Sequence, residues 1–127
     1  MAIVKNDWVG AITGSVYTTA SSDAIKPPTG KVFIAITILT ADTTFDAAAG
    51  LVSEKRVNNT ISSSVTNNVY IGTDAAAHDL ADGSETVDEG SGGLVVDSVD
   101  FPVGITLYGR WTEIDVADGA IVAYIGD

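Results

Sequence analysis

The sequence predicts an all-β protein: a single-domain antiparallel sandwich or barrel-like fold with a C-terminal hairpin and at most one or two short helices. Valine, isoleucine, threonine, serine and glycine dominate the chain, and these residues are typical of strands and turns. Only residues 44–51 and 74–82 have helix-compatible composition, and Gly50 or Gly83 would end each helix after about two turns. A length of 127 residues corresponds to one domain.

The first third of the chain predicts three strands. A short strand is expected within residues 2–14, where Trp8 is an anchor for the core or for an interface, and an alternating strand within residues 15–22. Pro27 and Pro28 then break the pattern, because they lack amide donors. Residues 32–39 are apolar on both faces of a strand, so we expect this strand to be central and covered on both sides.

The middle of the chain is more weakly patterned. Residues 51–71 contain short apolar groups separated by polar intervals, which indicates weak strands. Residues from about 73 to 93 are rich in glycine, alanine and acidic residues, so we expect a long exposed acidic loop. The domain prediction is therefore one β-rich domain over residues 1–127, with an N-terminal arm at about 1–9 and an acidic excursion at about 73–93.

The C-terminal third has the strongest pattern. From Ile105 to Trp111, odd-numbered residues share one strand face and even-numbered residues the other. Asp118 and Gly119 form a two-residue turn signal, since both tolerate a positive φ. We therefore expect residues 120–126 to pair back onto residues 112–116 as a closing hairpin.

Composition excludes several classes of function. A net charge of −11, with only six Lys and Arg residues, argues against binding to a nucleic-acid backbone. No apolar run approaches the ~18 residues that a membrane-spanning helix needs. The absence of cysteine excludes disulfides and thiolate chemistry. No signal peptide is visible, so we expect the chain to mature in the compartment where it is made.

Catalytic patterns are also absent, and we predict that the protein is not an enzyme and binds no cofactor. His78 is the single histidine, it lies in the acidic loop, and no serine has a G-x-S-x-G context. A calcium site is the better chemical alternative, with Asp79, Asp82 and Glu85 as candidate oxygen ligands. The EF-hand spacing is not met, and a solvated acidic loop is the simpler interpretation.

Arg110 is the single arginine of the second half of the chain, and it lies between Gly109 and Trp111. One interpretation is structural: a salt bridge to an acid such as Glu113 or Asp115, or stacking on an aromatic ring. The other is a subunit contact, because Arg, Trp and Tyr are enriched in interface hot spots. The residues that we predict at an interface are Ile3, Val4, Trp8, Tyr108, Arg110 and Trp111.

The C-terminal sequence FPVGITLYGRWTEIDVADGAIVAYIG resembles the ending of small structural proteins of tailed bacteriophages, notably those of marine and cyanobacterial hosts. The earlier segment KVFIAITILTADTTFDAAAGLV is similar to an apolar strand, "TxFD" turn and "GLV" in the same proteins. Together the two segments cover roughly 50 of the 127 residues. The resemblance implies a small β-rich virion component without catalytic activity.

The function that this resemblance implies is a capsid decoration or cement protein, made in the host cytoplasm and bound to the outer surface of the phage head. Its partners would be the major capsid protein and further copies of itself, with a trimer favoured; we expect no nucleic acid and no membrane among its partners. Two alternatives remain: a tail, fibre or host-recognition module of the same virion, and a calcium-binding β-domain.

Overall fold

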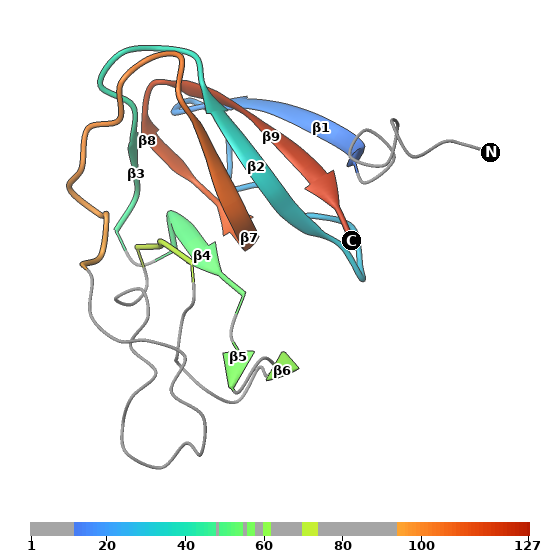
Figure 1. Ribbon diagram of the computed structural model, residues 1–127. Coiled ribbons are helices and arrows are strands. Elements are labelled where there is room, and N and C mark those ends of the chain that lie inside the picture. The colour runs from blue at the N-terminus through green and yellow to red at the C-terminus, as the bar shows by residue number, and fades with distance from the viewer. Residues whose placement is uncertain (1–11, 48, 55, 58–59, 62–69, 74–93) are drawn as a thin grey trace.

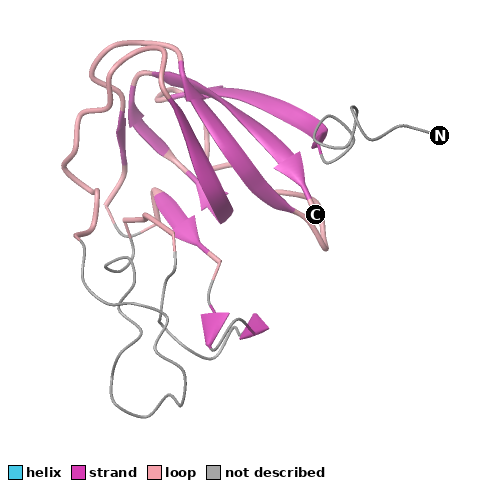
Figure 2. Ribbon diagram, viewed as in Figure 1, coloured by secondary structure: helices cyan, strands magenta, loops and turns pink. Residues whose placement is uncertain are grey.

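The computed structural model describes residues 12–47, 49–54, 56–57, 60–61, 70–73 and 94–127. Within these residues the protein is all-β, with antiparallel strand pairs and no helix (Figures 1 and 2). The predicted all-β antiparallel fold is thereby confirmed. The sheets do not close into a barrel.

A five-stranded antiparallel sheet forms the body of the protein, in the order β1-β9-β2-β7-β4 (Figure 1). Strands distant in the sequence lie side by side in this sheet: β9, the last strand of the chain, lies between β1 and β2. The strands are β1 (Ile12–Thr19), β9 (Ala120–Gly126), β2 (Val32–Ile38), β7 (Thr106–Ile114) and β4 (Leu51–Ser53). Two small sheets accompany it: β3 (Thr44–Phe45) with β8 (Val116–Asp118), and β5 (Arg56–Val57) with β6 (Thr60–Ile61).

Strand β2 is the central strand, as its two apolar faces predict. The expectation that it is covered on both sides is not met by the described residues: the core packs on one face, and on the other Ala35 pairs with Tyr108, which is 79% exposed. It pairs with β9 on one side and with β7 on the other. An irregularity between Phe33 and Ala35 shifts the register against both neighbours. Because of this shift Phe33 lies on the same face as Ile36 and Ile38, which strict alternation would not allow.

The hydrophobic core lies on one face of the five-stranded sheet. There β3, β8 and the chain that leads into β7 cover the sheet (Figure 1). The rings of Phe45 and Phe101 meet edge to face across this layer, with centroids 5.7 Å apart. The buried cluster consists of Phe33, Ile36, Ile38, Phe45, Leu51, Phe101, Trp111, Ile114, Val116, Ile121 and Ala123.

The predicted C-terminal hairpin is wrong in its pairing. Gly119 does make the turn, with φ +96°, but β9 pairs with β1 and β2, and β8 pairs with β3. The turn is a corner at which the chain leaves the small sheet and enters the large one. A Cβ atom on Gly119 would lie 2.3 Å from the hydroxyl of Thr43, so the corner is also closely packed.

The helix-compatible segment at residues 44–51 forms β3, a turn and the start of β4. The amide of Asp46 donates to the carbonyl of Asp115, and the amide of Asp115 donates to the carbonyl of Gly50. These bonds tie the turn to the end of β7. A Cβ on Gly50 would lie 1.9 Å from the carbonyl oxygen of Asp46, so this turn requires glycine. The second such segment, residues 74–82, lies outside the described residues.

Candidate interaction surface

The second face of the five-stranded sheet carries the candidate interaction surface. Cross-strand partners point to the same side of a sheet, so the pairing registers define which residues share this face. One row across the strands contains Ser15, Tyr124, Ala35 and Tyr108. The adjacent row contains Tyr17, Val122, Thr37 and Thr106. We call these eight residues the tyrosine face.

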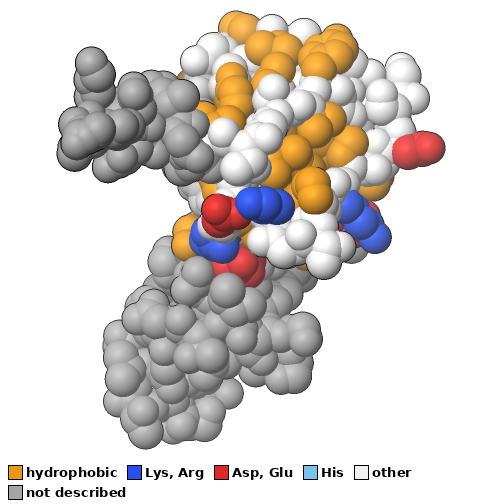
Figure 3. Space-filling model, turned by 90° about the vertical axis from the view of Figure 1, so that its right-hand side faces the viewer, with side chains coloured by type: hydrophobic (Ala, Val, Ile, Leu, Met, Phe, Trp, Pro, Cys, Tyr) orange, Lys and Arg blue, Asp and Glu red, His pale blue; other side chains and the backbone are white. Residues whose placement is uncertain are grey.

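The tyrosine face is the side of the sheet opposite the core. Tyr17 is 66% exposed and Tyr108 is 79% exposed, and Tyr124 between them is half-buried. Figure 3 shows hydrophobic side chains gathered over one side of the molecule, above a band of charged residues. Large exposed aromatic side chains in one area are unusual on a protein that has no partner, and they mark interaction sites.

Two threonines stiffen the middle of this face. The hydroxyls of Thr37 and Thr106 share a hydrogen bond of 3.0 Å between β2 and β7. Each hydroxyl therefore has a hydrogen-bond partner within the chain. If a partner protein covered the two threonines, neither hydroxyl would be left without a hydrogen bond. The eight residues of the tyrosine face are uncharged, and this hydrogen bond links two of the strands that carry them.

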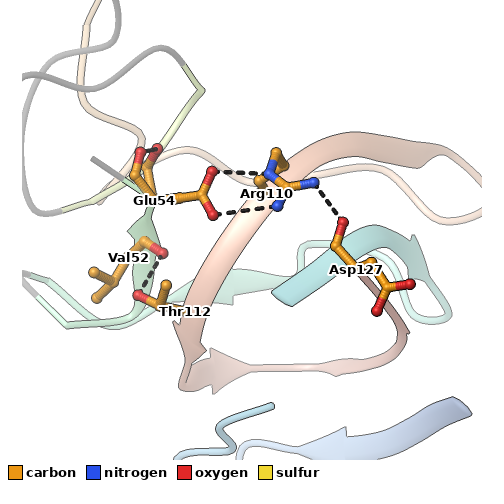
Figure 4. A network of polar contacts seen from close by, with 6 residues as sticks. Val52, Glu54, Arg110, Thr112 and Asp127 are labelled. Atoms are coloured by element: carbon orange, nitrogen blue, oxygen red, sulfur yellow. Dashed lines mark hydrogen bonds and ion pairs between the residues drawn. The ribbon is translucent and has the colours of Figure 1, made fainter. Parts of the chain in front are cut away.

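A charged network borders the tyrosine face at one end of the strands (Figure 4). Arg110 donates from Nε to Glu54 Oε1 at 2.8 Å and from an Nη to Glu54 Oε2 at 3.3 Å, in a bidentate pair. Its other Nη donates to the carbonyl of Asp127 at 2.8 Å. The carboxylate of Asp127 in turn pairs with Lys31.

Arg110 joins three strands of the sheet through these contacts. It belongs to β7, Glu54 follows β4, and Asp127 follows β9 on the far side of β2. The hydrogen bond to Glu54, opposed in part by burial, raises the pKa of Arg110 above its ordinary value, so the guanidinium stays charged. The predicted structural role is therefore met by Glu54, and not by Glu113 or Asp115.

The residues beside Arg110 have different environments. Tyr108 lies on the tyrosine face, whereas Trp111 has 0% exposure and donates from its indole nitrogen to the carbonyl of Ile71 at 2.7 Å. Its ring lies against Gly109, where a Cβ would be 2.8 Å from it. Since Trp111 belongs to the core, it offers no side chain to a partner.

The other predicted site residues lie outside the described part of the chain. These are Ile3, Val4 and Trp8 of the proposed arm, and the calcium candidates Asp79, Asp82 and Glu85. Within the described residues, no three or more His, Cys, Asp or Glu side chains are placed so that they could hold a metal ion. The calcium alternative stays a prediction, which a calcium chelator would test through the melting temperature.

Acidic side chains gather where β7 ends, on the turn that Gly50 closes. The carboxyls of Asp46 and Asp115 are hydrogen-bonded, with Glu113 and Asp23 nearby. Burial, the hydrogen bond to Asp46 and the negative charges around it raise the pKa of Asp115 above its ordinary value. A positive charge also lies beside this group: Nζ of Lys26 is 4.0 Å from Oε1 of Glu113.

Sequence reasoning missed most of the tyrosine face. Tyr17, Val122 and Tyr124 were not among the predicted interface residues, although alternation within residues 12–19 and 120–126 places each on a definite side of its strand. Alternation separates two sides but does not say which one a second layer covers. That information comes from the pairing of β9 with β1 and β2.

Comparison with known proteins assigns neither a family nor a function to this surface. No helix in the described residues has the length and apolar character that crossing a membrane would require. No family model, no curated protein and no solved structure matches the chain.

Proposed function

We propose that this protein is a non-enzymatic structural component of a phage virion, a decoration or cement protein that binds the outside of the capsid through its tyrosine face. The observation that supports this most directly is the exposure of Tyr17 and Tyr108 on a sheet face whose other members are uncharged. The resemblance of residues 101–126 to small phage structural proteins supports the same proposal from the sequence.

The chemistry of the surface suits a protein partner. Tyrosine is enriched in interface hot spots, since a large rigid ring buries much area and its hydroxyl still finds a hydrogen-bond partner. Around this aromatic centre lies the charged rim of Lys31, Arg110 and Asp127. An apolar centre with a polar rim is the common anatomy of protein–protein interfaces. The net charge of −11 disfavours the DNA inside the shell as a partner.

The proposed role follows from mass action. A ligand that binds only the assembled shell stabilises that shell, and the effect grows with the number of bound copies. The decoration role needs a rigid docking surface and no turnover. In this protein the surface is built on strands whose opposite face is a packed core, so it is held in place before binding.

Binding to capsids that lack the protein tests the proposal. Each of Tyr17→Ala and Tyr108→Ala removes an exposed ring and should weaken capsid binding by at least tenfold, because each hot-spot truncation costs about 2 kcal/mol. Leu94→Ala is the matched control, since Leu94 is 83% exposed and lies outside the tyrosine face. Unchanged binding of both tyrosine variants, measured by co-sedimentation with capsids, would contradict the proposal.

Copy number separates the decoration role from the tail, fibre or host-recognition alternative. A decoration protein occupies sites over the whole shell, so quantitative gels of purified particles should show copies in proportion to the major capsid protein. A tail or host-recognition module would be present in low copy number. A low count would remove the decoration role and favour the alternative.

A further inference from the structure

The five-stranded sheet has two edges, and they differ in what lies against them. Strand β4 forms one edge and β1 the other. An edge strand presents unpaired backbone N–H and C=O groups, which can pair with a strand of another chain. Each edge is therefore a possible site of strand addition, unless another part of the chain occupies it.

The β4 edge is occupied. The amide of Thr73 donates to the carbonyl of Leu51 at 2.8 Å, and the amide of Leu51 donates to the hydroxyl of Thr73 at 2.8 Å. The adjacent carbonyl of Gly72 accepts from the amide of Val96. These bonds place residues 72–73 along β4, so a further strand cannot add there without displacing them.

The β1 edge is open within the described residues. Strand β1 is eight residues long, and among the described strands it pairs with β9 alone. No other described segment forms a backbone hydrogen bond to residues 12–18. Every second residue of such a strand directs its N–H and C=O groups away from its one neighbour.

Strand β1 lacks two of the usual protections of an edge. Its sequence, ITGSVYTT, contains no charged residue and no proline, and the irregularity between Ile12 and Gly14 affects only its first residues. The absence of charge matters in a chain whose net charge is −11. On β1 there are no like charges that would repel the same strand of a second copy.

We propose that a second copy of this chain pairs with this edge, β1 against β1 in antiparallel orientation, so that two five-stranded sheets become one continuous sheet. Because, in the part of the chain that the structure describes, one edge is open and the other is occupied, the contact joins two identical edges, which produces a closed two-fold dimer. A trimer through sheet edges would need two different open edges on each copy. The inference is thus a dimer, in place of the trimer that a decoration protein suggests.

The register of this pairing follows from the faces of β1. Cross-strand partners must point to the same side, so the two-fold axis has to pass through a residue and not between two residues. The register shift near Ile12 limits the regular stretch to Gly14–Thr19, and the Thr19 carbonyl already accepts from the amide of Ser22 at 3.0 Å. Centring on Val16 uses Gly14–Thr18 and avoids Thr19.

Pairing centred on Val16 also joins the two tyrosine faces. Tyr17 would lie opposite the partner's Ser15 on the exposed side, and the two copies of Val16 would meet on the core side. Both tyrosine faces then point the same way on one extended sheet. This dimer does not depend on capsid binding, so its test and the capsid-binding test can fail separately.

The mass of the full chain in solution is the first test. Sedimentation at rising protein concentration should show a species of twice the 13.0 kDa chain mass, and no trimer. Ser15→Lys adds a charge to the exposed side of β1 and should shift the equilibrium toward the monomer by at least tenfold. Ser98→Lys makes the same charge change away from β1 and should leave the dimer intact. A monomer at all concentrations, or a trimer, overturns the proposal.

Cross-linking tests the register. The native chain has no cysteine, so Val16→Cys introduces a single thiol. Directly opposed residues of an antiparallel pair have Cα atoms about 4.5–5.5 Å apart, which suits a disulfide. We expect mild oxidation to cross-link Val16→Cys and to leave Ser98→Cys as monomer on a denaturing gel. If a dimer forms in solution but Val16→Cys does not cross-link, the contact lies elsewhere and the proposal is wrong.

Discussion

At the scale of single residues, the pair formed by Arg110 and Glu54 has the clearest physical consequence. Glu54 is only 6% exposed, and a carboxylate so far removed from water needs a charged or hydrogen-bonding environment. Arg110 supplies two parallel donors to it. The same guanidinium also donates to the carbonyl of Asp127, so that one side chain from the middle of β7 contacts the residues that follow β4 and β9.

Arg110→Ala should therefore destabilise the protein by about 3 kcal/mol, because the buried Glu54 carboxylate loses its positive partner. Urea denaturation measures this change. Lys26→Ala is the control: Lys26 is largely exposed and 4.0 Å from Glu113, so its loss should change the free energy of unfolding by less than about 1 kcal/mol. Equal effects of the two substitutions would contradict a special role for Arg110.

Asp115 predicts a pH dependence of stability. Its pKa in the folded state is raised, first by burial and then by its hydrogen bond to Asp46. In the pH range between the unfolded and folded pKa values the folded state binds more protons, so stability falls as pH rises through that range. At neutral pH the charged carboxylate of Asp115 therefore lowers the free energy of unfolding of the protein.

Asp115→Asn should raise stability at about pH 7 by roughly 0.5 kcal/mol, the size of a like-charge contact between neighbouring strands. The gain should be smaller near pH 4, because the raised pKa of Asp115 makes its carboxyl take up a proton at a higher pH than an ordinary aspartate. Thermal unfolding at the two pH values measures both. Asp97→Asn changes the net charge equally at an exposed position and should show a smaller pH-dependent gain. A gain that is the same at both pH values would count against the Asp46–Asp115 contact.

At the scale of elements, β2 was predicted with the most success. Its two apolar faces indicated a central strand, and it lies third of five in the sheet. Its internal register was not predictable, because the irregularity after Phe33 moves one aromatic ring to the other face. A local pattern cannot show a bulge that arises from the match between two partner strands.

The corner at Gly119 shows the opposite case. The Asp-Gly turn signal was correct only in part: Gly119 has a positive φ, whereas Asp118 belongs to β8 and does not, and the strands on either side do not pair with one another. A two-residue hairpin turn needs positive φ at both positions, so the single glycine makes a corner between sheets and not a hairpin. The pairing was decided by β1 and β2, which take both sides of β9.

Gly119→Ala should destabilise the protein by about 1–3 kcal/mol, since a residue with Cβ is strained at φ +96° and its Cβ would meet the hydroxyls of Thr40 and Thr43. Gly30→Ala is a matched control, because Gly30 also has a positive φ of 83° but open space where a Cβ would be. Thermal unfolding should show a larger loss for Gly119→Ala. An equal loss would mean that packing at the corner contributes nothing.

At the scale of the whole molecule, the sheet separates two environments. One face holds the packed core, and the other holds the tyrosine face with its charged rim. Within the described residues, one edge of the sheet is occupied by residues 72–73 and the other, β1, is open. The arrangement leaves a face and an edge for two different contacts, which our two proposals assign to a capsid and to a second copy.

The amino-acid sequence alone determined the all-β class and the central position of β2, because these depend on local composition and alternation; for Arg110 it left a structural salt bridge and a subunit contact both open. It did not determine the partner of Arg110, the pairing of β9 or the tyrosine face. Those depend on which segments distant in the chain meet, as Glu54 and Arg110 do across β4 and β7. Alternation defines two sides of every strand, and only the layer packed against one of them decides which side faces outward.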